Sequence, residues 1–359
     1  MGHRYIGSKT KILKEVLEKI QEIVPTGSHV VDLMCGTASV SSALREAGYK
    51  VTAVDVMTYS YHHARVALLL SDLPSFSGIA DFISEQKIDT KDSSNYIKIL
   101  NILNELEGTK GYFWNEFSCE GEPADAKKPR NYFSPSNAER IDSIRGKIKK
   151  LHDEALISDI EHSLLLHDLI MATNDIANIS GTYGHYMSKL TGRALSPIML
   201  KPTKLLSTDK NTNHTIIKGY AEEISAVVKC DLCYIDPPYM KRQYAANYHI
   251  LETLAREDTP VAVGESGLRP WRDQYSNFCT KTKIRDSFTK IFNEMQCSDF
   301  LISYSEDGLL SIADLTEFLS DFGEVVISTI EHKRFRSNNS KLDNKLTEYL
   351  IHLKIKDVT

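Results

Sequence analysis

The chain has 359 residues, of which 42% are hydrophobic and 25% are charged, and its formal net charge is −5. This composition is typical of a globular protein and excludes a disordered, collagenous or disulfide-scaffold protein. No apolar run approaches the ~20 residues of a membrane helix, and the polar start of the chain does not resemble a signal peptide. We therefore expect a cytoplasmic protein with no membrane partner, built from about two units at ~150 residues each.

The net charge hides an uneven distribution. Residues 104–126 contain six acidic side chains and one basic one, whereas residues 185–204 contain no acid and four bases. A second basic stretch covers residues 333–345. Local basic surfaces indicate phosphate binding better than the total charge does, although an ordinary solvated surface explains either stretch equally well when taken alone.

The first part of the chain predicts alternating helices and strands. Apolar spacing predicts an amphipathic helix over residues 11–24, then a buried strand over 29–33 and a helix that ends near 47. A second strand over 50–55 is followed by a helix to about residue 70. This order is the beginning of a doubly wound α/β sheet.

The pattern changes between residues 72 and 202, where no strand–helix–strand signal recurs. Helices are predicted there at 95–106, 137–152 and 157–179, so we interpret 72–202 as an inserted, mostly helical domain. Residues 1–71 and 203–359 then form the two halves of one Rossmann-like sheet. The second half has predicted strands at 215–218, 232–235, 300–304, 325–330 and 348–355, with helices from 221 and at 283–295 and 312–320.

Two acidic residues end the first two predicted strands. Asp32 is followed by a small-residue turn that contains Gly36 and opens a helix, and Asp55 ends the second strand. Backbone N–H groups in such a turn approach a ligand closely, and an acid in the position of Asp55 can bind both hydroxyls of a ribose. The full dinucleotide fingerprint G-x-G-x-x-G is absent, which favours an adenosyl ligand without phosphates, such as S-adenosylmethionine. An ordinary βαβ unit with polar strand ends remains an alternative at this point.

The strand over 232–235 ends in the sequence Asp236-Pro237-Pro238-Tyr239. Two prolines end a strand abruptly because neither can donate a hydrogen bond to the sheet. The turn presents a carboxylate, the Pro237 carbonyl and an aromatic ring together. Two acceptors and a stacking ring are what an exocyclic amine on a planar base requires when it attacks a methyl group.

Metal chemistry has little support in the sequence. Cys230 and Cys233 form a C-x-x-C pair, but no second pair lies at a matching distance and the two residues fall in a strand-like run. We interpret them as buried free thiols and expect no metal.

These motifs together resemble the Dam-like, alpha-class N6-adenine DNA methyltransferases, and most of all the modification enzymes of type II restriction systems. RYIGSK at 4–9 is similar to the N-terminal cofactor motif of that family, and residues 32–40 and Asp55 are similar to its Rossmann motifs. The resemblance covers nearly the whole chain and continues in further stretches, at 131–134, 179–184, 244–252, 302–305 and 333–336.

The resemblance implies roles for individual residues. Asp236, Pro237, Pro238 and Tyr239 correspond to the catalytic motif, with Asp236 and the Pro237 carbonyl accepting from the adenine amine and Tyr239 stacking on the base. The implied S-adenosylmethionine contacts are Tyr5, Gly7, Lys9, Asp32, Gly36 and Asp55. Ala38 departs from the family by replacing a common second glycine, and the contact to the cofactor adenine ring stays unassigned.

The family also implies double-stranded DNA and a cognate restriction endonuclease as partners. A flipped base is required for chemistry on adenine, and aromatic and basic side chains are suited to meet the duplex. The residues assigned to DNA are Tyr183, Tyr186, Lys189, Arg193, Tyr244, Asn247, Arg334 and Arg336. For the Tyr-rich segment 244–248, packing at a helix start is the competing interpretation.

Three other functions are weighed against this one. An amino-group methyltransferase acting on RNA or protein keeps the chemistry, but the motif order and the large insertion argue against it. A catalytically silent DNA-binding partner does not need the intact catalytic motif and Asp55. A nicotinamide oxidoreductase requires the missing glycine fingerprint and leaves the double proline unexplained.

Overall fold

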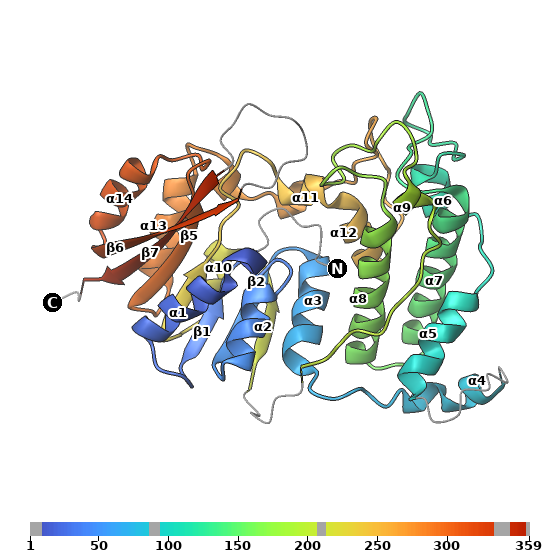
Figure 1. The fold of residues 1–359 in the computed structure, drawn as a ribbon, viewed down its shortest axis with the longest axis horizontal. Helices are drawn as coiled ribbons and strands as arrows, with labels where there is room; N and C mark the ends of the chain where they lie inside the picture. Colours follow the sequence, from blue (N-terminus) through green and yellow to red (C-terminus); the bar gives the residue numbers. More distant parts are fainter. Residues whose placement is uncertain (1–8, 86–93, 207–212, 334–344, 357–359) are drawn as a thin grey trace. The chain divides into compact units, whose positions relative to one another are not determined.

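A computed structural model describes residues 9–85, 94–206, 213–333 and 345–356 (Figure 1). The chain divides into two compact units, one built around a β-sheet and one built from helices. The sheet unit comprises Gly7–Leu68, Thr208–Tyr244 and Gln274–Thr359, and the helical unit comprises Met1–Ile6, Leu69–Ser207 and Ala245–Asp273.

The sheet unit contains a seven-stranded sheet in the order β3-β2-β1-β4-β5-β7-β6. The first five strands in this order are parallel, and β7 runs antiparallel to both β5 and β6. The strands are β1 His29–Asp32, β2 Lys50–Asp55, β3 Thr215–Lys218, β4 Leu232–Ile235, β5 Asp299–Ser305, β6 Gly323–Lys333 and β7 Lys345–Ile355. The central strand β1 joins the two halves of the chain, because it pairs with β2 on one side and with β4 on the other.

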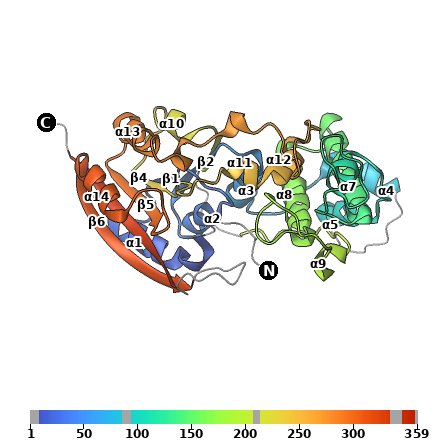
Figure 2. The same cartoon turned by 90° about the horizontal axis from the view of Figure 1, so that it is seen from above.

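Both faces of the sheet are apolar, and helices cover each of them. Val30 and Leu232 face a core that α1, α2 and α3 complete, whereas Val31 and Cys233 face a second core with α10, α13 and α14. In the view of Figure 2, α13 and α10 lie on one side of the strands and α1 on the other. These helices are α1 Leu13–Ile23, α2 Ser39–Glu46, α3 Thr58–Leu69, α10 Ala221–Ile224, α13 Ile284–Glu294 and α14 Ile312–Ser320. Alternation of buried side chains along each strand thus gives a three-layer α/β arrangement.

Two short 3-10 helices also shape the sheet unit. They are η1 Lys9–Lys11, which precedes α1, and η4 Asn277–Cys279, which precedes α13. Lys9 is almost completely buried although it belongs to a type of residue that is rarely inside. Its surroundings are therefore part of the site described below.

The helical unit is held by long helices with well-formed ends. Ser158 begins α8 with a capping box in which its side chain and that of Glu161 each accept from the other's backbone. Ser134 caps α7, whose first residue is Pro135. The helices of this unit are α4 Ala80–Glu85, α5 Asn95–Glu105, α6 Tyr112–Phe117, α7 Pro135–Asp153, α8 Asp159–Ile176, α9 Gly192–Leu195 and α12 His249–Arg256, together with η2 Ser77–Ile79. The helix α11 Tyr244–Asn247 and the 3-10 helix η3 Arg272–Gln274 each span a position where the chain passes from one unit to the other.

The predicted fold class, a Rossmann-like sheet with a mostly helical insertion, is confirmed. The strands predicted at 50–55, 215–218 and 232–235 have the observed bounds. The helical unit contains, in addition to the predicted insertion, the segment Ala245–Asp273 that follows the catalytic motif. The recognition role given to residues 72–202 stays a prediction. No helix in the described part of the chain is long and apolar enough to cross a membrane.

Candidate active site

Three acidic residues meet at one edge of the sheet because their strands are parallel neighbours. Asp32 ends β1 and Asp55 ends β2, and Asp236 directly follows β4. Asp32 is in register with Ala53 of β2 and with Tyr234 of β4. Ligands of open α/β sheets bind outside the carboxyl ends of the strands, which is where this group lies.

Asp236 shares a buried ammonium group with Glu348. The Nζ atom of Lys9 lies 3.1 Å from Oδ1 of Asp236 and 3.4 Å from Oε2 of Glu348. The side chains of Lys9 and Glu348 are each 5% exposed and that of Asp236 is 17% exposed. Removing charges from water is costly unless they are paired, so the three groups depend on one another.

Tyr239 is fixed from several directions. Its hydroxyl donates to Oε1 of Glu348 at 3.3 Å, and its ring centroid lies 5.3 Å from Nζ of Lys9. The ring of Tyr304 meets it edge to face, with 5.6 Å between the centroids. The hydroxyl of Tyr304 is itself held, since it accepts from the backbone N–H of Leu310 at 3.0 Å.

The turn after β4 leaves the carbonyl of Pro237 available. The Tyr239 carbonyl accepts from the N–H of Leu309 at 3.0 Å, and the Pro238 carbonyl accepts from the thiol of Cys279 at 3.7 Å. Among the described residues, nothing donates to the carbonyl of Pro237. This is the acceptor that the double proline predicts.

The electrostatics keep the ammonium charged and make Asp236 a weak base. Burial raises the pKa of Asp236 to about 6; Lys9 opposes this rise and Glu348 adds to it. Burial by itself lowers the pKa of Lys9, but Asp236 and Glu348 outweigh burial, so the pKa of Lys9 lies above its usual value. At neutral pH, Lys9 is therefore protonated and most Asp236 is ionised.

The turn between β1 and α2 is built around Asp55. Its Oδ2 accepts from the N–H of Gly36 and its Oδ1 from the N–H of Met57, each at 2.8 Å. Gly36 adopts φ 53° and Ala38 adopts φ 59°, a left-handed conformation that is costly for alanine. Ala38 therefore follows the path that the family's second glycine takes more easily.

Asp32 contains an orphaned buried oxygen. Its Oδ2 accepts from the hydroxyl of Ser41 at 2.6 Å, whereas its Oδ1 is buried without a partner. Burial raises the pKa of Asp32 to about 7, and the charges of Asp236 and Asp55 contribute to this rise. Because buried polar atoms usually have a hydrogen-bond partner, this oxygen is a candidate acceptor for a ligand.

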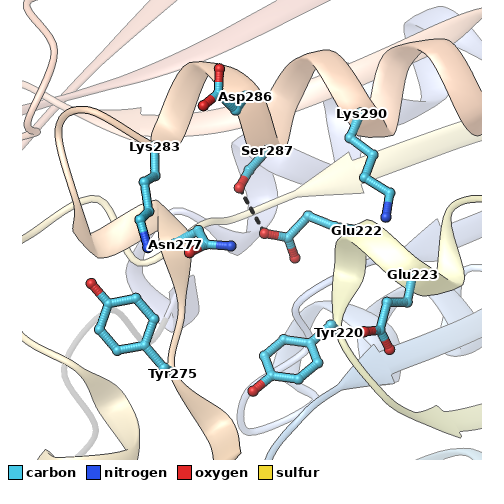
Figure 3. A pocket seen from close by; sticks show the side chains of 9 residues that line it. All are labelled: Tyr220, Glu222, Glu223, Tyr275, Asn277, Lys283, Asp286, Ser287 and Lys290. Carbon is cyan, nitrogen blue, oxygen red and sulfur yellow. Dashed lines mark hydrogen bonds between the residues drawn. The ribbon is translucent and has the colours of Figure 1, made fainter. Parts of the chain in front are cut away.

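A separate cavity of about 500 Å³ lies between α10 and α13 (Figure 3). Its wall includes Glu222, whose carboxylate accepts from the hydroxyl of Ser287 at 2.7 Å. None of the predicted catalytic or cofactor residues lines it. One lining residue, Tyr220, directly follows Gly219. The N–H of Gly219 donates to the carbonyl of Asp55 at 3.0 Å, so this wall of the cavity lies near the end of β2.

Comparison with known proteins identifies the family. The family described as D12 class N6 adenine-specific DNA methyltransferase matches residues 5–317. The chain belongs to this family.

Individual relatives are similar over nearly the whole chain. The Type II methyltransferase M.FokI of Planomicrobium okeanokoites is 32% identical over 99% of this chain and 53% of its own length. Modification methylase StsI of Streptococcus sanguinis is 29% identical over 98% of this chain and 52% of its own length. The Type II methyltransferase M.CviAII of Paramecium bursaria Chlorella virus 1 is 30% identical over 98% of both chains. The chain thus spans about half the length of the first two relatives and nearly all of the third.

Similarity to solved structures is weaker. TehB from Haemophilus influenzae covers 95% of this chain and 62% of its own, with a TM-score of 0.37 and 9% sequence identity. A likeness at this level adds nothing to the fold or to the function.

The structure describes only some of the predicted site residues. Lys9, predicted to contact the cofactor, lies against Asp236 and Glu348. Tyr5, Gly7, Arg334 and Arg336 lie outside the described residues, so their predicted roles stay predictions.

Among the residues assigned to DNA, Tyr183 requires a correction. It is fully buried and its hydroxyl donates to Oδ1 of Asn174 at 3.1 Å, while its carbonyl accepts from the ring of His249 at 3.0 Å. Its side chain therefore offers no surface to a duplex, and it packs inside the helical unit instead. Tyr186 is partly buried and meets the ring of Tyr132 edge to face at 5.0 Å.

Lys189 and Arg193 are both exposed, Lys189 on a loop and Arg193 in the short helix α9 that follows it, and the buried Asn178 holds this loop in place. The side-chain amide of Asn178 donates to the Met187 carbonyl at 2.9 Å and accepts from the N–H of Thr191 at 3.3 Å. Tyr244 and Asn247 begin and end α11 and are both partly buried. Their predicted contacts with DNA remain untested.

Glu348 is the site residue that sequence reasoning missed. It lies in β7, beyond the end of the family match at residue 317, and no local motif marks it. Its partners are 339 and 109 residues away along the chain, so only the sheet order brings it to the site. The sequence offers little signal for it, because Glu348 is one of several polar residues in β7, with Thr347, His352 and Lys354.

Asp32→Asn should change how stability depends on pH. The raised pKa means that the folded state favours protonated Asp32, so this stabilisation is present at low pH and is lost as pH rises through about 7. Asparagine keeps an acceptor for Ser41 and carries no charge. Relative to wild type, the variant should therefore gain up to about 4 kcal/mol of unfolding free energy between about pH 4 and pH 8, at about 1.4 kcal/mol per pKa unit. Denaturant unfolding at several pH values measures this, and parallel curves for the two proteins would contradict the assignment.

Proposed function

We propose that this chain is a site-specific DNA adenine methyltransferase that transfers a methyl group from S-adenosylmethionine to the N6 amine of a flipped adenine. The observation that carries the proposal is the turn at Asp236–Tyr239, where an ionised carboxylate, an available carbonyl and a fixed aromatic ring follow one strand. Membership of the adenine-specific family supports the choice of substrate.

The protein groups act on the amine by accepting its protons. Lys9 occupies Oδ1 of Asp236, which leaves Oδ2 for one N–H of the adenine amine. The Pro237 carbonyl accepts the other N–H. With both protons held, the nitrogen lone pair points away from the base plane. Asp236 has a pKa of about 6 and needs only to accept a hydrogen bond, because alignment supplies much of the acceleration.

The ends of β1 and β2 fit S-adenosylmethionine. The buried, unpartnered Oδ1 of Asp32 suits a cationic donor, and the methionine part of the cofactor carries an ammonium group. Asp55 ends β2 and accepts from two backbone N–H groups of the neighbouring turns, and an acid at the end of this strand is the group that binds ribose hydroxyls in Rossmann-like sheets. When bound, the cofactor supplies the methyl group from its sulfonium sulfur, and this chemistry needs no metal.

Double-stranded DNA is the proposed partner of the helical unit. The segment 187–195, which carries Lys189 and Arg193, is held by contacts of the buried Asn178 with Met187 and Thr191, so both charges are presented on ordered backbone. A cognate restriction endonuclease is proposed as a functional partner, because relatives are named as type II methyltransferases and modification methylases. Methyl transfer to an amino group of RNA or protein is the alternative, because it uses the same chemistry. Assays that compare DNA, RNA and protein as methyl acceptors distinguish these substrates.

Asp236→Asn should abolish most turnover while the protein stays folded. The amide presents a donor or a neutral oxygen where an ionised acceptor is needed, so single-turnover methyl transfer should fall by about 100-fold or more. Lys9 keeps Glu348 as a partner, and a neutral group at position 236 removes the burial penalty of a carboxylate. Melting temperature and cofactor binding by calorimetry should therefore change little.

Asp231→Asn is the matched control for this variant. Asp231 lies just before the other end of β4 and accepts from the N–H of His29 at 2.7 Å, away from the catalytic turn. It should retain normal turnover. Near-normal transfer by Asp236→Asn in the same assay contradicts the mechanism.

Removal of the positive charges of segment 187–195 should weaken DNA binding without changing which sequence is preferred. If Lys189 and Arg193 contact phosphates, Lys189→Gln and Arg193→Gln should each reduce the slope of log affinity against log salt by about one unit. Lys149→Gln serves as the control, because Lys149 is occupied by Asp153 at 2.7 Å on the exposed side of α7. A changed sequence preference with an unchanged salt slope would assign these residues to base contacts instead.

A further inference from the structure

Glu348 links the carboxylate and the aromatic ring of the catalytic turn, Asp236 and Tyr239. Its Oε1 accepts from the Tyr239 hydroxyl at 3.3 Å, and its Oε2 lies 3.4 Å from Nζ of Lys9, which in turn contacts Asp236. Glu348 pairs with Ser305, the last residue of β5, and Glu348 as a whole is only 4% exposed. The carboxylate is thus rigidly placed by the antiparallel end of the sheet.

Resting on the function proposed above, we propose that Glu348 is a positioning residue for methyl transfer. It divides the charge of Lys9 between two carboxylates and orients the ring of Tyr239. It does not touch the substrate in this account. Its effect passes through Lys9 to Asp236 and through the hydroxyl to Tyr239.

Charge sharing matters because a carboxylate engaged by a single ammonium is a poor acceptor for a second donor. With Glu348 present, the cluster of Lys9, Asp236 and Glu348 carries one net negative charge. Part of the attraction of Lys9 is directed away from Asp236, and the second oxygen of Asp236 keeps its acceptor strength for the amine. A strong electrostatic contact of this kind is effective in catalysis when it is preorganised in a water-poor site.

The sign of the effect on Asp236 follows from the charges around it. The titratable groups that face Asp236 within the described chain are Lys9 from η1, Asp32 from β1, Tyr234 of β4, Tyr239 of the turn and Glu348 from β7. Glu348 raises the pKa of Asp236, and Lys9 lowers it. Neutralising Glu348 removes a like charge and leaves Lys9 to Asp236 alone, so the pKa of Asp236 should fall.

The test compares wild type with Glu348→Gln in single-turnover methyl transfer over a range of pH. The variant should lose about tenfold or more in the plateau rate, since small misplacements of reacting groups cost rates of this order. Its acid limb should move to lower pH, and the affinity for S-adenosylmethionine should stay near that of wild type. Glu348→Asp, which keeps the charge one methylene further back, should give an intermediate plateau and is the second variant if Glu348→Gln does not fold.

His352→Gln is the control on the same face of β7. His352 contacts Asp299 at 2.8 Å, four residues from Glu348 and outside the cluster. It should leave the pH profile unchanged. An equal shift in this control, or a pH profile of Glu348→Gln that matches wild type, overturns the proposal.

A readout that needs no turnover separates this inference from the proposed function. Carbon-13 NMR of the Asp236 carboxyl should show its titration at lower pH in Glu348→Gln than in wild type. If wild type transfers no methyl group to DNA, the proposed function fails, and the titration still decides the role of Glu348. An unchanged Asp236 titration overturns the positioning role in either case.

Discussion

The Lys9 ammonium lies between two buried carboxylates, and the catalytic turn depends on this arrangement. Three charged groups are removed from water within one small region, which is tolerable only because each has a partner at 3.1 to 3.4 Å. The same contacts place the ring of Tyr239 and set the acceptor strength of Asp236. Loss of the Lys9 charge would leave both carboxylates without this cation, whereas loss of either carboxylate leaves Lys9 with the other one as a partner.

The sheet brings these residues together from distant parts of the sequence. Asp32, Asp55 and Asp236 meet because β1, β2 and β4 are parallel neighbours whose carboxyl ends share an edge. Glu348 reaches the same edge from the opposite chain direction, since β7 is antiparallel to β5. Under the proposed function, these adjacent strand ends place the cofactor site next to the turn that accepts from the target amine.

Local sequence was sufficient for the parts of the site that follow a strand. The strand bounds, the double proline and the acids at strand ends are all encoded within a few residues, and the structure places Asp32, Gly36, Asp55 and Asp236 at one sheet edge as expected. Contacts between distant segments could not be derived in this way. Pairing of β7 with β5 decides the position of Glu348, and the packing of Tyr132 and His249 around Tyr183 turns a predicted surface residue into a core residue. The role of Asn178 depends in the same way on a loop that returns to it.

The account is tested most directly by expressing the chain in a host that lacks DNA methylation and mapping modified bases by long-read sequencing. The account predicts N6-methyladenine at one position of a single recurrent sequence throughout the host genome, and its absence when the catalytic carboxylate is replaced by an amide. An unmodified genome in cells that contain the folded, cofactor-binding protein, with methyl groups found instead on RNA or protein, would contradict it.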